Sequence, residues 1–118
     1  MRYKALVVDD QESVRTLLAR ILEDEGYDVA QASCGKDGIK AVKLYEPDVV
    51  FSDVNMLGMS GLEMAAQIRE RNYKVKICLI SGTRPERLPE DVDGFIQKPF
   101  EINDIRAMLS DLFSDQPR

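Results

Sequence analysis

Residues 3–26 read YKALVVDDQESVRTLLARILEDEG and contain the patterns of a buried strand and an amphipathic helix, in that order. Residues 3–8 form a short apolar run of the kind seen in strands that are buried on both faces. After two aspartates, apolar residues recur at helical spacing over 13–25. Gly26 is placed to end this helix, because glycine readily adopts the left-handed conformation that follows many helices. A strand followed by a helix is the repeating unit of α/β proteins.

The same alternation continues along the rest of the chain. It predicts further strands at 27–31, 48–52, 75–80 and 93–97, and further helices at 36–45, 62–71 and 101–113. In the second helix, Ile39, Val42 and Leu44 are expected to face mostly inward. Strands joined by helices favour a parallel sheet with right-handed crossovers and helices on both faces. The sequence therefore predicts one α/β domain over 1–118 with a five-stranded parallel sheet, in which 114–118 form a tail or the start of a linker.

Composition argues against nucleic acid as a direct partner and against a membrane-inserted protein. Sixteen Lys and Arg against 21 Asp and Glu give a net charge of −5, which has the wrong sign for direct nucleic-acid binding. The apolar run Ala5 to Val8 is too short for a secretory or membrane-spanning segment, so we expect a cytoplasmic protein without membrane insertion. Cys34 and Cys78 lack metal-binding spacing and the chain has no histidine, so both are expected to be buried free thiols.

Polar side chains follow four of the five predicted strands. Asp9 and Asp10 follow the first strand, Asp53 the third, Ser81 the fourth and Lys98 the fifth. Because parallel strands all end on one edge of the sheet, we expect these side chains to converge there. Carboxylate oxygens without His or Cys favour a hard cation, and a small acidic site with room for water suits Mg²⁺ better than Ca²⁺. Lys98 is the cation expected to hold Asp53 in place.

These residues stand in a pattern that resembles the receiver domain of two-component response regulators. The resemblance rests on Asp9-Asp10, on DVNMLGMSG at 53–61, on Ser81-Gly82 and on KPF at 98–100. It extends from about Lys4 to Leu112, nearly the whole chain. Each motif alone is weak, but the set in this order, each at a predicted strand end, is highly specific. The resemblance implies a flavodoxin-like sheet of strand order 2-1-3-4-5.

The resemblance also implies a phosphorylation-activated signalling switch. Asp53 would accept a phosphoryl group from the phosphohistidine of a sensor histidine kinase, from a phosphotransfer protein or from a small phosphodonor. In the implied site, Mg²⁺ is bound by Asp9, Asp10, Asp53 and the Asn55 backbone carbonyl. Ser81 and Lys98 bind the phosphoryl group, and Phe95 is the aromatic residue that changes position. The peptide bond before Pro99 is expected to be cis. Such a domain is not an enzyme in the usual sense, although self-phosphorylation and autodephosphorylation are possible, and its downstream protein partner is not indicated.

Other interpretations of the same residues remain open. Asp9 and Asp10 could serve only as acids before the first helix, Ser81 could cap the turn after its strand, and Phe95 could be partial core. At the level of function, the alternatives are a small aspartate-nucleophile phosphatase or phosphotransferase and a receiver-like interaction module that never takes phosphate. The two adjacent acids and the small size disfavour the phosphatase, and the complete acceptor set disfavours the module.

The chain departs from the family pattern in two regions. Leu57 stands where the family commonly has proline, and serine replaces the commoner threonine at Ser81, with Gly82 leaving the site open to water. The segment 84–94, RPERLPEDVDG, is too short and too rich in proline for a full helix, because Pro89 would break its hydrogen bonding. We therefore expect the fourth helix of the family to be shortened or absent, so that the signalling face beside it differs here.

Overall fold

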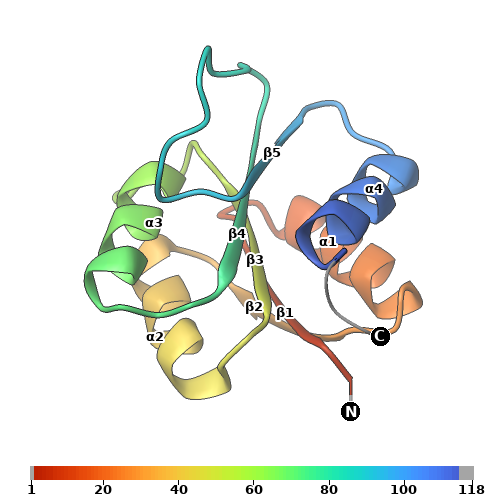
Figure 1. The fold of residues 1–118 in the computed structure, drawn as a ribbon, viewed down its shortest axis with the longest axis horizontal. Coiled ribbons are helices and arrows are strands. Elements are labelled where there is room, and N and C mark those ends of the chain that lie inside the picture. Colours follow the sequence, from red (N-terminus) through yellow and green to blue (C-terminus); the bar gives the residue numbers. More distant parts are fainter. Residues whose placement is uncertain (1, 115–118) are drawn as a thin grey trace.

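The structure is a computed structural model that describes residues 2–114, in which strands and helices alternate (Figure 1). The strands are β1 (Lys4–Val8), β2 (Asp28–Ala32), β3 (Val49–Asp53), β4 (Lys76–Ser81) and β5 (Gly94–Gln97). The helices are α1 (Glu12–Asp24), α2 (Gly35–Tyr45), α3 (Gly61–Glu70) and α4 (Ile102–Leu112). Within the described range, no helix has the length and apolar character to cross a bilayer. Of the predicted tail, Ser114 is exposed, and 115–118 lie outside the described residues.

The five strands form one parallel sheet in the order β2-β1-β3-β4-β5, which confirms the predicted topology. Helices α2 and α3 cover one face of the sheet, and α1 and α4 cover the other (Figure 1). Every element boundary lies within one residue of its predicted position. Gly26 ends α1 with a φ of +95°, a left-handed conformation that glycine adopts without steric cost.

The core consists of two apolar layers, one on each face of the sheet. Along β1, Ala5 and Val7 belong to the layer beneath α1 and α4, whereas Leu6 and Val8 belong to the layer beneath α2 and α3. Successive side chains of a strand point to opposite faces, so both faces must be apolar when both are covered. The central strands therefore consist of continuous apolar runs that end in polar residues at the open edge.

Two predictions about burial are wrong. Leu44 is 79% exposed, because it lies two residues after the buried Val42 and thus on nearly the opposite side of α2. Cys34 is only partly buried, because it is the residue at which the chain turns into α2. Cys78 is buried in β4 as expected, and this burial raises the pKa of its thiol. Both thiols are free.

Residues 82–93 connect β4 to β5 without a regular helix, in agreement with the prediction that a helix here is shortened or absent. Pro85 and Pro89 lack the N–H groups that a helix through this segment would need. A turn in which the Val92 N–H donates to the Pro89 carbonyl at 3.1 Å leads the chain back into β5. In Figure 1 the segment projects beyond the end of the sheet next to α3.

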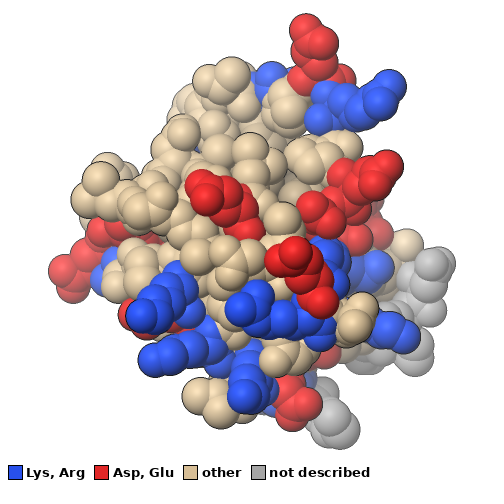
Figure 2. Space-filling model, turned by 90° about the vertical axis from the view of Figure 1, so that its left-hand side faces the viewer, with Lys and Arg blue, Asp and Glu red and all other residues tan. Residues whose placement is uncertain are grey.

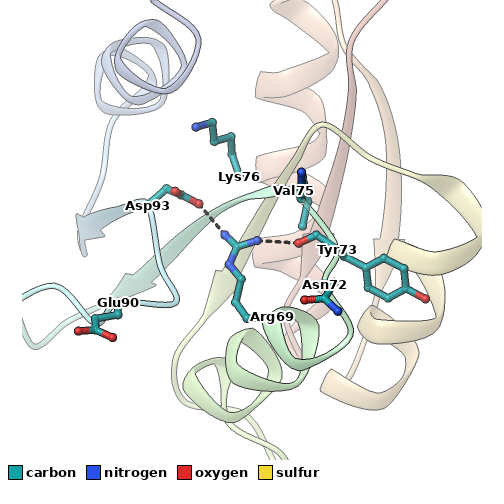
Figure 3. Close-up of a pocket in the computed structure, with 8 residues that line it drawn as sticks. Arg69, Asn72, Tyr73, Val75, Lys76, Glu90 and Asp93 are labelled. Carbon is teal, nitrogen blue, oxygen red and sulfur yellow. Dashed lines mark hydrogen bonds and ion pairs between the residues drawn. The ribbon is translucent and has the colours of Figure 1, made fainter.

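Arg69, near the end of α3, ties the last part of this segment to the rest of the domain (Figure 3). Its guanidinium donates to the Asp91 carbonyl at 3.0 Å, to the Tyr73 carbonyl at 3.0 Å and to the Asp93 carboxylate at 2.8 Å. The same Asp93 oxygen accepts the Ile77 N–H at 2.8 Å. One side chain thus joins α3, the start of β4 and the entry to β5.

Replacing Arg69 with alanine is expected to lower the free energy of unfolding by about 1–2 kcal/mol, since three hydrogen bonds are lost and Asp93 loses its charged partner at a half-exposed site. Urea unfolding measures this change. Arg71→Ala is the matched control, because Arg71 is exposed just after α3 and its guanidinium donates only to Gln67 in the last turn of that helix. Equal losses in the two variants would contradict the anchoring role.

Candidate functional site

The polar residues predicted to converge do so at the carboxyl edge of the sheet. The strand register sets their places: Val8 pairs with Ser52, Asp53 with Ile80, and Ser81 with Gln97. Asp9 follows Val8 directly and therefore lies beside Asp53 in the neighbouring strand. Because the strands are parallel and in close register, residues far apart in sequence reach one place without any long loop.

Three carboxylates form the centre of the site. One oxygen from each of Asp9, Asp10 and Asp53 lies within 4.8 Å of the other two. Asp9 and Asp53 are buried, with 1% and 7% of their surfaces exposed, whereas Asp10 is exposed. Three acids at this separation repel one another, and their oxygens are the ligand type that Mg²⁺ prefers. The donor set therefore fits a hard divalent cation.

Lys98 supplies positive charge to this cluster. Its Nζ lies 3.3 Å from Oδ2 of Asp53, and the lysine side chain is 29% exposed. The Lys98 N–H donates to the Ser81 carbonyl at 2.9 Å, so the sheet pairing of β4 and β5 continues up to this residue. The Lys98–Pro99 peptide bond is cis, as the resemblance implies.

The surroundings of Asp9 raise the pKa of its carboxyl group. Burial is the largest cause and raises the pKa of Asp9 above its ordinary value. The Gln11 N–H donates a hydrogen bond to the Asp9 carboxylate at 2.9 Å and lowers the pKa. Repulsion from Asp53 raises the pKa further, and attraction from Lys98 lowers it. The net effect is a raised pKa, which means that the charged form of Asp9 is disfavoured, as expected for a carboxylate that is buried near other acids.

The remaining predicted residues lie around the cluster, and one of them, Asn55, donates a hydrogen bond to it. Ser81 is buried, and its hydroxyl accepts the Thr83 N–H at 3.2 Å, which is the turn-capping contact left open above. Asn55 is exposed, and its N–H points at Oδ1 of Asp53 from 3.4 Å. Phe95 is half-buried, with the Arg84 guanidinium 5.5 Å from the centre of its ring.

Several contacts that shape the site were not predicted from the sequence. Arg15 of α1 donates to the Asp9 carbonyl at 2.8 Å, and the Leu57 N–H donates to the Asp10 carboxylate at 3.1 Å. Gly61 begins α3 so close to Asp53 that a side chain there would strike the Asp53 carbonyl oxygen. The Ser60 hydroxyl and the Glu63 carboxylate form a reciprocal cap at the start of α3. The S-x-x-E spacing of Ser60 and Glu63 was a signal of this cap. Gly61 is the last residue of the motif at 53–61, but its close approach to Asp53 was not predicted, and the sequence gives no signal for the contact of Arg15.

Comparison with known proteins identifies the family. The sequence model of the response regulator receiver domain matches residues 5–110. This chain belongs to the receiver-domain family of response regulators.

The relatives of this receiver domain include both single-domain and longer proteins. The chemotaxis protein CheY of Halobacterium salinarum is 31% identical over 119 residues, which cover 97% of this chain and 99% of CheY. The transcriptional regulatory protein PhoP of Bacillus subtilis, named for alkaline phosphatase synthesis, is 34% identical over 114 residues, covering 92% of this chain and 48% of PhoP. The receiver domain thus spans about half the length of PhoP and nearly all of CheY.

One solved relative is a complex with Mg²⁺-BeF. The response regulator TrrA of Thermotoga maritima, solved in complex with Mg²⁺-BeF, superposes with a TM-score of 0.84 at 31% identity. The match covers 93% of this receiver domain and 98% of TrrA. The similarity between this receiver domain and TrrA therefore extends over the whole fold that positions the site.

Proposed function

We propose that this receiver domain is a phosphorylation-activated switch in which Asp53 accepts a phosphoryl group from a histidine kinase or a phosphotransfer protein. The observation that carries the proposal is the placement of Asp53 itself. Its carboxylate is buried at a strand end, within 4.8 Å of two further acids and 3.3 Å from the Lys98 ammonium. These 118 residues contain no histidine, so the donor imidazole lies outside them.

In the proposed reaction, an Asp53 oxygen attacks phosphorus, a P–O bond forms, and the P–N bond to the donor imidazole breaks. The leaving imidazole keeps the bonding electron pair and takes up a proton. Lys98 offsets negative charge on Asp53 before the transfer and can bind a phosphoryl oxygen after it. The Ser81 hydroxyl lies at the end of the adjacent strand and can bind another oxygen if it turns from Thr83.

Asp9, Asp10, Asp53 and the Asn55 backbone carbonyl would hold Mg²⁺ in this proposal, Asp9 either directly or through water. When bound, the ion would offset the charge that gathers on the phosphoryl oxygens. The three converging carboxylates and the disturbed pKa of Asp9 support such a site, since a cation relieves their repulsion.

Mg²⁺ is expected to stabilise the fold by about 1.4 kcal/mol at a tenfold excess over its Kd. Asp10→Asn should weaken this effect, because it removes one of the three clustered carboxylates. Thermal unfolding over a Mg²⁺ titration measures both. Asp111→Asn, which changes an exposed acid on α4, is the matched control and should respond as the wild type does. Stabilisation that is the same in all three proteins would contradict a site at Asp10.

Incubation with a small acyl phosphate tests the proposed function. We expect intact mass to rise by one phosphoryl group when Mg²⁺ is present and to stay unchanged when a chelator removes it. The rival aspartate-nucleophile phosphatase makes a different prediction: turnover of an external phosphate ester that survives Asp53→Asn but not Asp9→Asn. A protein that takes up no phosphoryl group under any of these conditions would be the interaction module instead.

In this proposal, phosphorylation is signalled to a downstream protein by a change in the shape of the surface around Ser81 and Phe95. If Ser81 turns toward the phosphoryl group, its bond with Thr83 at the start of the helix-free segment is lost. Phe95, now half-buried beneath Arg84, would then move inward, and the altered surface would change the affinity for a downstream protein.

A further inference from the structure

Asp10 is the exposed member of the three clustered acids. Asp9 and Asp53 are buried, and each carboxylate accepts the N–H of the residue two positions further on. The Asp9 carbonyl also accepts a hydrogen bond from Arg15 of α1 at 2.8 Å. In the described part of the chain, the Asp10 carboxylate accepts one hydrogen bond, from the Leu57 N–H at 3.1 Å. The Leu57 N–H is therefore the group that fixes the direction of the Asp10 side chain.

This donor is a main-chain group of the loop between β3 and α3. Residues 54–60 carry no charged side chain that could pair with Asp10. On the side of α2 and α3, Figure 2 shows few Lys or Arg between the charged groups at the top of the molecule and the basic groups in its lower half. A proline at position 57, which is common in the family, would have no N–H. The contact thus depends on a residue at which this chain departs from the family pattern.

We propose that the Leu57 N–H positions Asp10 for Mg²⁺. The inference rests on the proposed function, because it concerns the same cation site. One hydrogen bond to Oδ2 of Asp10 leaves its other carboxylate oxygen free for a cation. A carboxylate that is already held beside the other two acids loses less side-chain freedom when the ion binds. The Leu57 N–H should therefore tighten Mg²⁺ binding without touching the ion.

Leu57→Pro removes this N–H and tests the proposal directly. Outside glycine, the described residues with positive φ are Glu46 and Asn72, so Leu57 has the negative φ that proline needs. We expect the Kd for Mg²⁺, measured by titration calorimetry, to rise about threefold to tenfold. Leu57→Ala is the matched control, because it keeps the N–H and removes a side chain from a residue that is 84% exposed. Its Kd should equal that of the wild type.

A backbone ester at position 57 provides a second test that does not depend on how the loop accepts proline. The ester replaces the Leu57 N–H by oxygen and keeps the leucine side chain, so it should raise the Kd by a similar factor. Circular dichroism confirms that each variant is folded. A Kd equal to that of the wild type in the folded ester or in folded Leu57→Pro would overturn the proposal. So would a Leu57→Ala variant that binds Mg²⁺ as weakly as Leu57→Pro.

Asp10→Ala separates the positioning of Asp10 from a change in loop stiffness, which would act on Mg²⁺ through the Asn55 carbonyl. If the Leu57 N–H acts through Asp10, adding Leu57→Pro to Asp10→Ala should leave the Kd for Mg²⁺ unchanged, because no carboxylate remains to be positioned. A rise of the same size with and without the Asp10 carboxylate would overturn the proposal.

The wild type distinguishes failure of this inference from failure of the proposed function. If the wild type binds Mg²⁺ and gains a phosphoryl group while Leu57→Pro keeps the same Kd, the positioning role alone is overturned. A wild type that binds no Mg²⁺ would overturn the cation site and this inference with it.

Discussion

Asp53→Asn is expected to abolish uptake of a phosphoryl group from a small acyl phosphate, because an amide lacks the carboxylate nucleophile. Asparagine has nearly the shape of aspartate, so the fold should survive. The substitution also removes one negative charge from three carboxylates that lie within 4.8 Å of one another, although Lys98 loses its ion pair. Intact mass after incubation with Mg²⁺ measures the uptake, and thermal unfolding checks the fold.

Asp24→Asn is the matched control for this experiment. Asp24 is an exposed acid at the end of α1, paired with Arg20, and lies outside the cluster. This variant should gain one phosphoryl group as the wild type does. A gain of the same size in Asp53→Asn would show that another residue accepts the phosphoryl group.

Gly61→Ala is expected to damage both stability and phosphorylation. A Cβ at this position would collide with the Asp53 carbonyl oxygen and approach the Val54 Cα at 3.1 Å. These are backbone atoms, so relief requires the main chain to move, at a cost of about 3 kcal/mol. Because the displaced residue is the proposed nucleophile, the phosphorylation rate should also fall by roughly tenfold to a hundredfold. Urea unfolding and the rate of mass gain measure the two effects.

Gly82→Ala separates this collision from a general effect of losing a glycine. A Cβ at Gly82 meets nothing within 4 Å, so the free energy of unfolding should change by no more than about 0.5 kcal/mol. A Gly61→Ala variant as stable as Gly82→Ala would mean that α3 can shift away from Asp53 freely. The close approach would then have no part in positioning the nucleophile.

The convergence of Asp9, Asp10, Asp53 and Lys98 can be predicted from sequence for a physical reason. Each follows a segment that the alternation of strand and helix patterns predicts to be a strand, and parallel strands bring their carboxyl ends to one edge. The missing helix between β4 and β5 is equally predictable, because Pro85 and Pro89 remove backbone donors wherever they stand.

Other features depend on three-dimensional detail that periodicity does not contain. Leu44 is an exception, because helical spacing already places it nearly opposite the buried Val42 on α2, so its exposure could have been predicted. The contact of Arg15 with the Asp9 carbonyl depends on the direction of one side chain. The need for glycine at Gly61 follows from the distance between two segments, which sequence spacing does not fix.

Borohydride reduction of the phosphorylated protein tests the central claim most directly. The reagent reduces an acyl phosphate to an alcohol, so a phosphorylated aspartate becomes homoserine, and peptide mapping then finds its position. We expect homoserine at position 53 alone. Homoserine at position 9 or 10, or a phosphoryl group on the protein with no homoserine at all, would contradict phosphorylation of Asp53.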